Sequence, residues 1–106
     1  MTLPPILERD FQQQVTDLAE ICGWSWAHFR PARTLHGWTT PVSGPLGKGW
    51  PDLVLLRRER IVFAELKRDK GKVDAHQAWV LELLGAAAEA YVWRPSDLTA
   101  IAEVLR

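Results

Sequence analysis

The chain has few of the residues that define several protein classes. It contains one cysteine, Cys22, among 106 residues, so an internal disulfide is excluded. Cys22 falls on an apolar helical face, where a free thiol packs as a small hydrophobic group. No apolar run is long enough to span a bilayer, and no basic segment leads into an apolar one at the N-terminus. We therefore expect a protein of a reducing cytoplasm with no membrane association.

The sequence also lacks an excess of charge of either sign. Thirteen Lys and Arg residues balance thirteen Asp and Glu residues, so the formal net charge is zero. No overall attraction to nucleic acid is predicted, and a nucleic-acid-binding role would require a local basic patch. A zinc site is not indicated, because the cysteine and the three histidines lack the spacing of zinc ligands. A chain of this length fits a single domain, residues 1–106.

Two apolar runs, 49–56 and 61–67, are separated by a short charged link and predict a β-hairpin. Asp52 opens the first strand, and Glu65 and Lys67 lie near the end of the second. Because side chains alternate between faces along a strand, Glu65 and Lys67 share one face. The start of one strand lies beside the end of its antiparallel neighbour. Asp52, Glu65 and Lys67 are therefore predicted to converge.

Two carboxylates beside one ammonium group suit a hard divalent cation next to an anionic substrate. Mg²⁺ is usually held by one or two carboxylates, waters and substrate phosphate oxygens. A lysine there can hold the attacking water or stabilise negative charge that develops on phosphorus. The alternative is a structural Glu65–Lys67 ion pair on a half-exposed strand, with Asp52 as a turn residue after a proline.

An amphipathic helix is predicted from about residue 6 to residue 22, where Gly23 stops it. Its apolar stripe repeats at helical spacing and comprises Leu7, Phe11, Val15, Leu18 and Cys22. Glu8 lies seven residues before Val15 and so has nearly the same angular position, which directs it toward the sheet. The alternative is a glutamate placed at the helix N-terminus by the helix dipole.

The other predicted elements are a strand over 24–30, a long loop over 31–49, a helix over 75–88, a strand over 90–94 and a closing helix. The first three strands should form an antiparallel meander, to which the helical crossover adds a parallel strand. Asp74 is the predicted N-cap of the second helix. Gln77 lies on that helix's apolar face and points back at Glu65 and Lys67, where it could orient the lysine or a water bound to a metal.

Basic residues alternate with aromatic residues in the long loop, which suits contact with a phosphate backbone and exposed bases. The alternative is a flexible surface loop whose tryptophans fold back onto the core. Taking the loop and its flanks together with the end of the hairpin, we predict DNA contacts for five residues: Arg30, Arg33, His36, Lys48 and Arg68.

The order of these motifs resembles a known nuclease family. Gly49-Trp50-Pro51-Asp52 followed by Glu65-Leu66-Lys67 is similar to the Pro-Asp…Glu-x-Lys signature of the restriction-endonuclease-like superfamily. More narrowly, it resembles the virus-type replication-repair nuclease (VRR-NUC) domain, whose compact single-domain form is typical of bacteriophages. Gly71-Lys72, Gln77 and Val92-Trp93-Arg94-Pro95 follow in the family's order, so the resemblance covers nearly the whole chain.

The resemblance implies an α/β fold with a restriction-endonuclease-like core. That core has the order α-β-β-β-α-β plus a C-terminal helix, with a mixed four-stranded sheet flanked by helices. In this family Asp52, Glu65 and the Leu66 carbonyl would bind Mg²⁺, with Mn²⁺ as a substitute. Glu8 would complete the site or hold a second ion, Lys67 would position the attacking water, and the products would carry 5′-phosphate and 3′-hydroxyl ends.

The resemblance also implies a biological setting. Small relatives act as homodimers that cut Holliday junctions or other branched DNA in replication, repair or recombination, in the cytoplasm of a bacterial host cell. Two other functions remain open from the sequence. One is a flap or single-strand nuclease, and the other is a nucleic-acid-binding module without catalysis.

Overall fold

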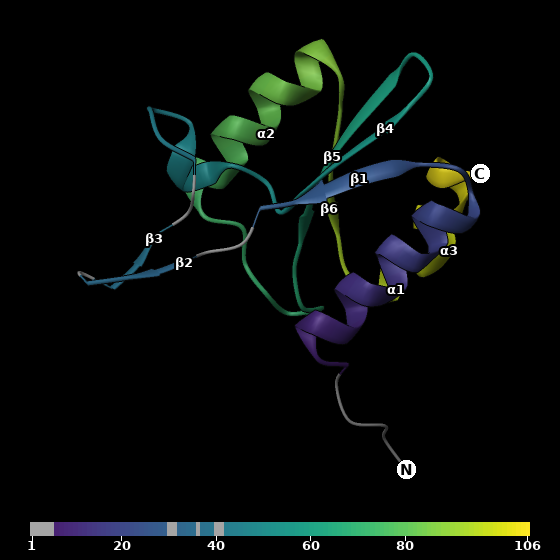
Figure 1. Ribbon diagram of the computed structural model, residues 1–106, viewed down its shortest axis with the longest axis horizontal. Coiled ribbons are helices and arrows are strands. Elements are labelled where there is room, and N and C mark those ends of the chain that lie inside the picture. Colours follow the sequence, from purple (N-terminus) through teal and green to yellow (C-terminus); the bar gives the residue numbers. More distant parts are fainter. Residues whose placement is uncertain (1–5, 30–31, 36, 40–41) are drawn as a thin grey trace.

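The computed structural model describes residues 6–29, 32–35, 37–39 and 42–106, with the backbone alone described at 32–34, 38 and 39 (Figure 1). The helices and strands along the chain are α1 (Glu8–Ile21), β1 (Ser25–His28), β2 (Ala32–Thr34), β3 (Gly37–Thr39), the 3₁₀ turn η1 (Gly47–Gly49), β4 (Leu53–Arg57), β5 (Arg60–Leu66), α2 (Ala75–Ala87), β6 (Glu89–Trp93), the 3₁₀ turn η2 (Pro95–Asp97) and α3 (Leu98–Leu105). None of the helices in these ranges combines the length and the hydropathy that crossing a bilayer requires.

The main sheet has the strand order β1-β4-β5-β6. β1 pairs antiparallel with β4, and β4 pairs antiparallel with β5 through a two-residue turn. β5 pairs in parallel with β6 after the α2 crossover. The predicted α/β fold with a mixed four-stranded sheet is therefore confirmed, as is its meander followed by a parallel strand.

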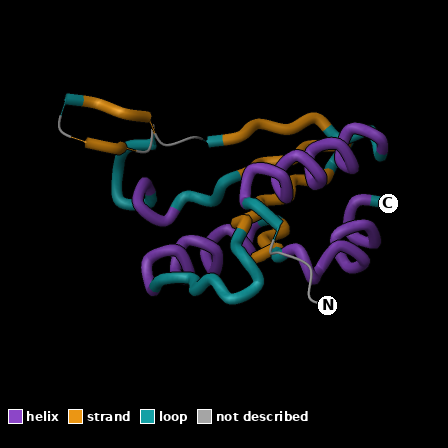
Figure 2. Tube along the Cα trace, turned by 90° about the horizontal axis from the view of Figure 1, so that it is seen from below, coloured by secondary structure: helices purple, strands orange, loops and turns teal. Residues whose placement is uncertain are grey.

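Helices cover both faces of this sheet (Figures 1 and 2). The core lies between the sheet and the α1–α3 pair. It contains Phe11, Val15, Ala19, Trp24, Leu53, Leu55, Val62, Ala64, Leu66, Trp93, Ile101 and Leu105. On β4 and β5 these core residues occupy alternate positions, as strand geometry requires. The intervening residues, Asp52 and Glu65 among them, belong to the opposite face, on which α2 lies.

The first helix is confirmed with a shift in its burial pattern. It ends before Gly23, whose φ of 83° is the left-handed conformation that favours glycine after a helix. Phe11 and Val15 are fully buried as predicted, while Leu7 precedes the first turn and is 52% exposed. Thr16, a polar residue, is buried and donates to the Gln13 carbonyl at 3.3 Å.

The segment predicted as a loop contains two short strands. β2 and β3 form a separate two-stranded antiparallel sheet that projects from the body of the molecule in Figure 1. Gly37 has a φ of 110°, which permits the tight reversal between the strands. Strands of three residues carry too few alternations for a period of two to be recognised in the sequence, so the prediction of a plain loop was wrong here.

One arginine joins three distant parts of the fold. The Arg57 guanidinium donates to the carbonyls of Cys22 at 2.9 Å, Leu105 at 2.9 Å and Arg106 at 3.1 Å. It also lies 4.5 Å from the ring centroid of Trp24. These hydrogen bonds join the end of β4 to the C-terminal ends of α1 and α3. Arg57 therefore stabilises the fold.

Candidate functional site

Asp52 and Glu65 lie side by side on the α2 face of the sheet. The register pairs Leu53 with Ala64, and its continuation by one residue sets Asp52 opposite Glu65. The Asp52 backbone N–H donates to Glu65 Oε1 at 3.2 Å, and the Leu66 backbone N–H donates to Asp52 Oδ2 at 2.8 Å. The predicted convergence of these two carboxyl groups on one face is present.

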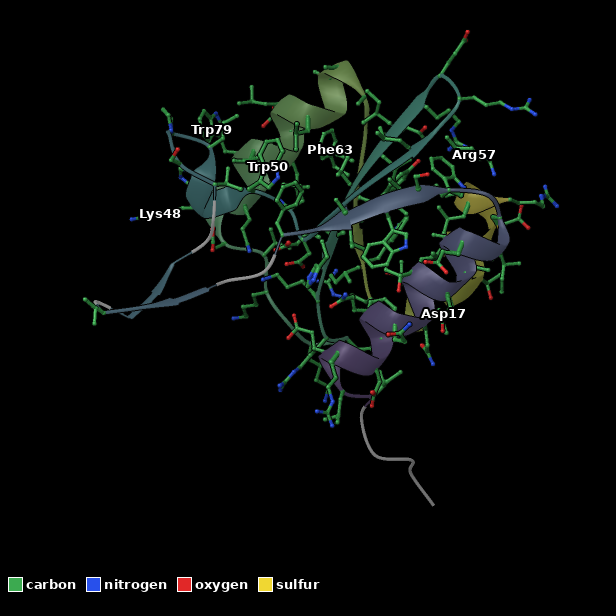
Figure 3. All side chains as sticks on the ribbon, viewed as in Figure 1. Asp17, Lys48, Trp50, Arg57, Phe63 and Trp79 are labelled. Carbon is green, nitrogen blue, oxygen red and sulfur yellow. The ribbon has the colours of Figure 1, made fainter. Side chains whose placement is uncertain are left out.

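A glycine and a tryptophan fix the path of the chain into Asp52. A Cβ at Gly49 would lie 2.6 Å from the His76 carbonyl oxygen, so only glycine allows η1 to approach α2 this closely. The Trp50 ring packs edge-on against Phe63, with ring centroids 5.5 Å apart (Figure 3). It also packs edge-on against Phe29, with ring centroids 5.8 Å apart. The backbone before Asp52 is therefore held between α2 and the sheet.

Glu65 is a buried carboxyl group, with 3% of its surface exposed. Its Oε2 accepts a hydrogen bond from Gln77 Nε2 at 2.5 Å and lies 3.7 Å from Lys67 Nζ. Burial is the largest cause that raises the pKa of Glu65, to about 8, and the adjacent Asp52 adds to it while Lys67 opposes it. When both carboxyl groups are ionised, one lysine does not balance their charge.

Gln77 is oriented by the cap of its own helix. Asp74 Oδ1 accepts from the Gln77 backbone N–H at 2.9 Å, and the Asp74 N–H donates to Gln77 Oε1 at 3.1 Å. This reciprocal capping box confirms Asp74 as the N-cap. Because the amide oxygen is already engaged, the amide nitrogen is directed at Glu65. The predicted proximity of Gln77 to Glu65 and Lys67 is present.

The backbone N–H and C=O of Leu66 point toward the start of β4, where Asp52 lies. The Leu66 N–H points toward Asp52, and the N–H and C=O of one strand residue point to the same side, so the Leu66 carbonyl is directed toward β4 as well. The Lys67 N–H instead donates to the Trp93 carbonyl at 3.0 Å, on the β6 side. The Lys67 side chain nevertheless reaches the site, because its Nζ lies 3.7 Å from Glu65 Oε2.

Glu8 differs from its prediction. It is the first residue of α1 and its side chain is exposed, so the expectation that it faces the sheet was wrong. Its neighbours Leu7, Arg9 and Asp10 are exposed too, and the buried positions of the helix begin at Phe11. In the described ranges no three acidic, histidine or cysteine side chains form a group able to hold a metal, so Glu8 is not joined to Asp52 and Glu65. Its role as an outer ligand stays a prediction.

The structure describes the five residues predicted to contact DNA to different extents. Lys48 is exposed on η1, where it points outward (Figure 3). Arg68 is exposed directly after Lys67. Arg33 lies in β2, with only its backbone described. Arg30 and His36 lie outside the described residues. DNA contact by all five stays a prediction.

The donor atoms of the site fit Mg²⁺ better than a softer metal. They are carboxylate and carbonyl oxygens, which hard cations prefer, and no thiol or imidazole accompanies them among the described residues of the site. His76, a histidine elsewhere on α2, bonds through its ring to the Pro45 carbonyl at 2.9 Å and packs against Trp79.

No protein-family model matches the chain, and no curated protein matches its sequence. The function must therefore be inferred from these residues and their geometry.

Proposed function

We propose that the protein is a Mg²⁺-dependent DNA endonuclease with a restriction-endonuclease-like core, similar to VRR-NUC domains and selective for branched DNA such as Holliday junctions. The observation that carries the proposal is the contact of Asp52 and Glu65 across two antiparallel strands, with Lys67 Nζ 3.7 Å from the Glu65 carboxyl group. A purely structural Glu65–Lys67 pair does not account for the second carboxyl group on the same face. Nor does it explain a buried Glu65 whose pKa is raised to about 8.

Each residue has a distinct part in the proposed hydrolysis. Asp52, Glu65 and the Leu66 carbonyl would hold Mg²⁺, which supplies Lewis-acid stabilisation of charge on the phosphate oxygens. The Lys67 ammonium group positions the attacking water and stabilises negative charge that develops on the phosphate. Gln77 keeps the Glu65 carboxyl group in place. Breaking the bond to the 3′-oxygen leaves 5′-phosphate and 3′-hydroxyl ends, as the resemblance implies.

Cleavage of defined substrates tests this proposal. The wild-type protein would be incubated with a four-way junction, a flap, a linear duplex, a single strand and a supercoiled plasmid, with Mg²⁺ or with EDTA. We expect Mg²⁺-dependent cutting, fastest on the junction, and 5′-phosphate ends in the mapped products. Cutting of flaps or single strands alone would favour the second nuclease function. Binding without cutting would favour a non-catalytic module.

The hydrogen bond from Gln77 to Glu65 leads to a prediction about how Gln77 positions the Glu65 carboxyl group. Replacing Gln77 with Ala removes the donor to Glu65 Oε2, and we expect the cleavage rate to fall by about 10- to 100-fold. The loss of its half of the capping box should lower the free energy of unfolding by about 1 kcal/mol. The matched control is Asp74→Ala, which weakens the same cap but leaves the Gln77 amide in place. Equal loss of rate in both variants would show that Gln77 acts only through helix stability.

The resemblance also leads us to propose a homodimer, and the sheet offers a surface for it. On the α2 face toward the β4–β5 turn, the apolar residues Leu56 and Ile61 pair across the strands and are 49% and 45% exposed. In a two-fold dimer the same patch of both subunits meets, and exposed apolar residues are a common part of such contacts. We predict that Leu56→Glu/Ile61→Glu converts a dimer to a monomer in light scattering coupled to size exclusion. An unchanged mass would remove this face from consideration.

A further inference from the structure

A short basic turn follows the strand that carries Glu65 and Lys67. The residues 68–72, here called the basic turn, contain three exposed cations, Arg68, Lys70 and Lys72. Within the described part of the chain, none of these side chains forms an ion pair with an acid. This distinguishes them from Arg57 and Arg60, whose guanidinium groups are occupied by protein acceptors.

The basic turn is held at two points by the chain after β6. The Gly71 N–H closes the turn on the Arg68 carbonyl at 2.9 Å. Arg94 Nη2 donates to the Gly71 carbonyl at 2.7 Å, and the Ser96 N–H donates to Asp69 Oδ1 at 2.9 Å. A Cβ at Gly71 would lie 3.3 Å from backbone atoms of Arg68, so the turn is tight. Its cations are therefore presented from a fixed backbone.

The one acid in the basic turn, Asp69, is exposed, and its Oδ1 accepts from the Ser96 backbone N–H. The hydrogen bond from the Ser96 backbone is the largest cause that holds the pKa of Asp69 below its usual value. With three cations and one ionised carboxylate, residues 68–72 carry a formal charge of +2. Asp74, the next acid along the chain, is likewise engaged as the cap of α2.

The zero net charge of the protein conceals a strong asymmetry along the chain. Residues 21–51 and 66–73 together carry seven Lys and Arg residues and one acid, which gives a formal charge of +6. Because the whole chain is neutral, the remaining residues carry −6. The positive segments are those that lead into Asp52 and out of Glu65, so positive charge borders the candidate site on both sides along the chain.

We propose that the basic turn binds the sugar–phosphate backbone of the DNA strand that is cut, with Lys70 and Lys72 as its main phosphate contacts. This inference rests on the proposed nuclease function and extends it by assigning a backbone-binding site next to Lys67. Arg94 and Asp69 are positioning residues for this site, because their hydrogen bonds to Gly71 and Ser96 hold the turn. A rigid cationic turn contacts phosphates without reading sequence, which agrees with selection of DNA by shape.

Binding measured apart from cleavage tests the inference. In an Asp52→Asn background, in which cutting is expected to be strongly slowed, the affinity for a fluorescent four-way junction would be measured by anisotropy at several salt concentrations. We expect Lys70→Ala/Lys72→Ala to weaken binding about tenfold or more and to reduce the slope of log K against log salt by about 2. The matched control is Arg9→Ala/Arg58→Ala, which removes the same charge from exposed positions on α1 and the hairpin turn.

Equal affinities and slopes for the two double variants would overturn the inference. Circular dichroism and thermal unfolding would establish that both variants fold as the parent does. Failure of the nuclease proposal is a separate outcome, because it would appear as an absence of Mg²⁺-dependent cutting by the wild type. A reduced slope in that case would still support a phosphate-binding site at the basic turn.

Discussion

Replacing Asp52 with Asn is expected to reduce Mg²⁺-dependent DNA cleavage by about 10³-fold or more. The amide oxygen can still accept the hydrogen bond from the Leu66 N–H, so the local backbone should be kept. What is lost is a negative charge at the point where a divalent cation would be held. Initial rates on a labelled junction at saturating protein would measure the effect.

The control for this substitution is Asp17→Asn. Asp17 is an exposed residue of α1 whose carboxylate accepts from Gln13, and Figure 3 shows it on the helix, away from the α2 side of the molecule. We expect its cleavage rate to equal that of the wild type. If Asp52→Asn cleaved as fast as Asp17→Asn, Asp52 would have no part in the chemistry. That result would contradict the proposal that Asp52 holds Mg²⁺.

Glu65 should make the protein less stable as the pH rises. Its pKa in the folded protein is raised to about 8, so between the ordinary value of a glutamate and pH 8 the folded state holds a proton that the unfolded state has released. The stability from this group is fully present below about pH 4.5 and is lost as the pH passes through 8. Because Glu65 is buried, the loss should reach a few kcal/mol.

Urea unfolding from pH 5 to pH 9 would measure this effect. Glu65→Gln cannot ionise, so its free energy of unfolding should change less between pH 6 and pH 9 than that of the wild type. The control Glu82→Gln, at an exposed position on α2, should follow the wild type. Mg²⁺ should restore stability to the wild type at pH 9 and have little effect on Glu65→Gln, since bound metal favours the ionised carboxylate. Parallel pH profiles for Glu65→Gln and wild type would contradict the assigned cause.

Local rules were sufficient for most of the site. Alternation along two short apolar runs predicted the hairpin and the shared face of Asp52 and Glu65, because register in a tight hairpin follows from the turn. The Asp74 cap followed from the preference of aspartate for the N-cap, and the inward direction of Gln77 followed from helix periodicity. Their combination into one reciprocal cap that aims the amide at Glu65 depends on how α2 sits against the sheet. Periodicity carries no information about that placement.

Three features depended on tertiary structure that a sequence pattern does not contain. Glu8 has the angular position of an inward residue, but it precedes Phe11, where the buried positions of α1 begin. The β2–β3 pair is too short to produce a periodic signal. The hydrogen bond from Arg94 to the Gly71 carbonyl joins residues 23 positions apart and fixes the basic turn. Only the packing of β6 beside β5 brings these two segments together.

The most direct test of the candidate site is a titration with Mn²⁺ followed by electron paramagnetic resonance, which reports metal binding without any DNA. We predict saturable binding to the wild type and to Asp17→Asn, with affinity at least about tenfold weaker for Asp52→Asn. Equal Mn²⁺ affinity for wild type and Asp52→Asn would mean that the Asp52 carboxyl group does not hold a divalent cation.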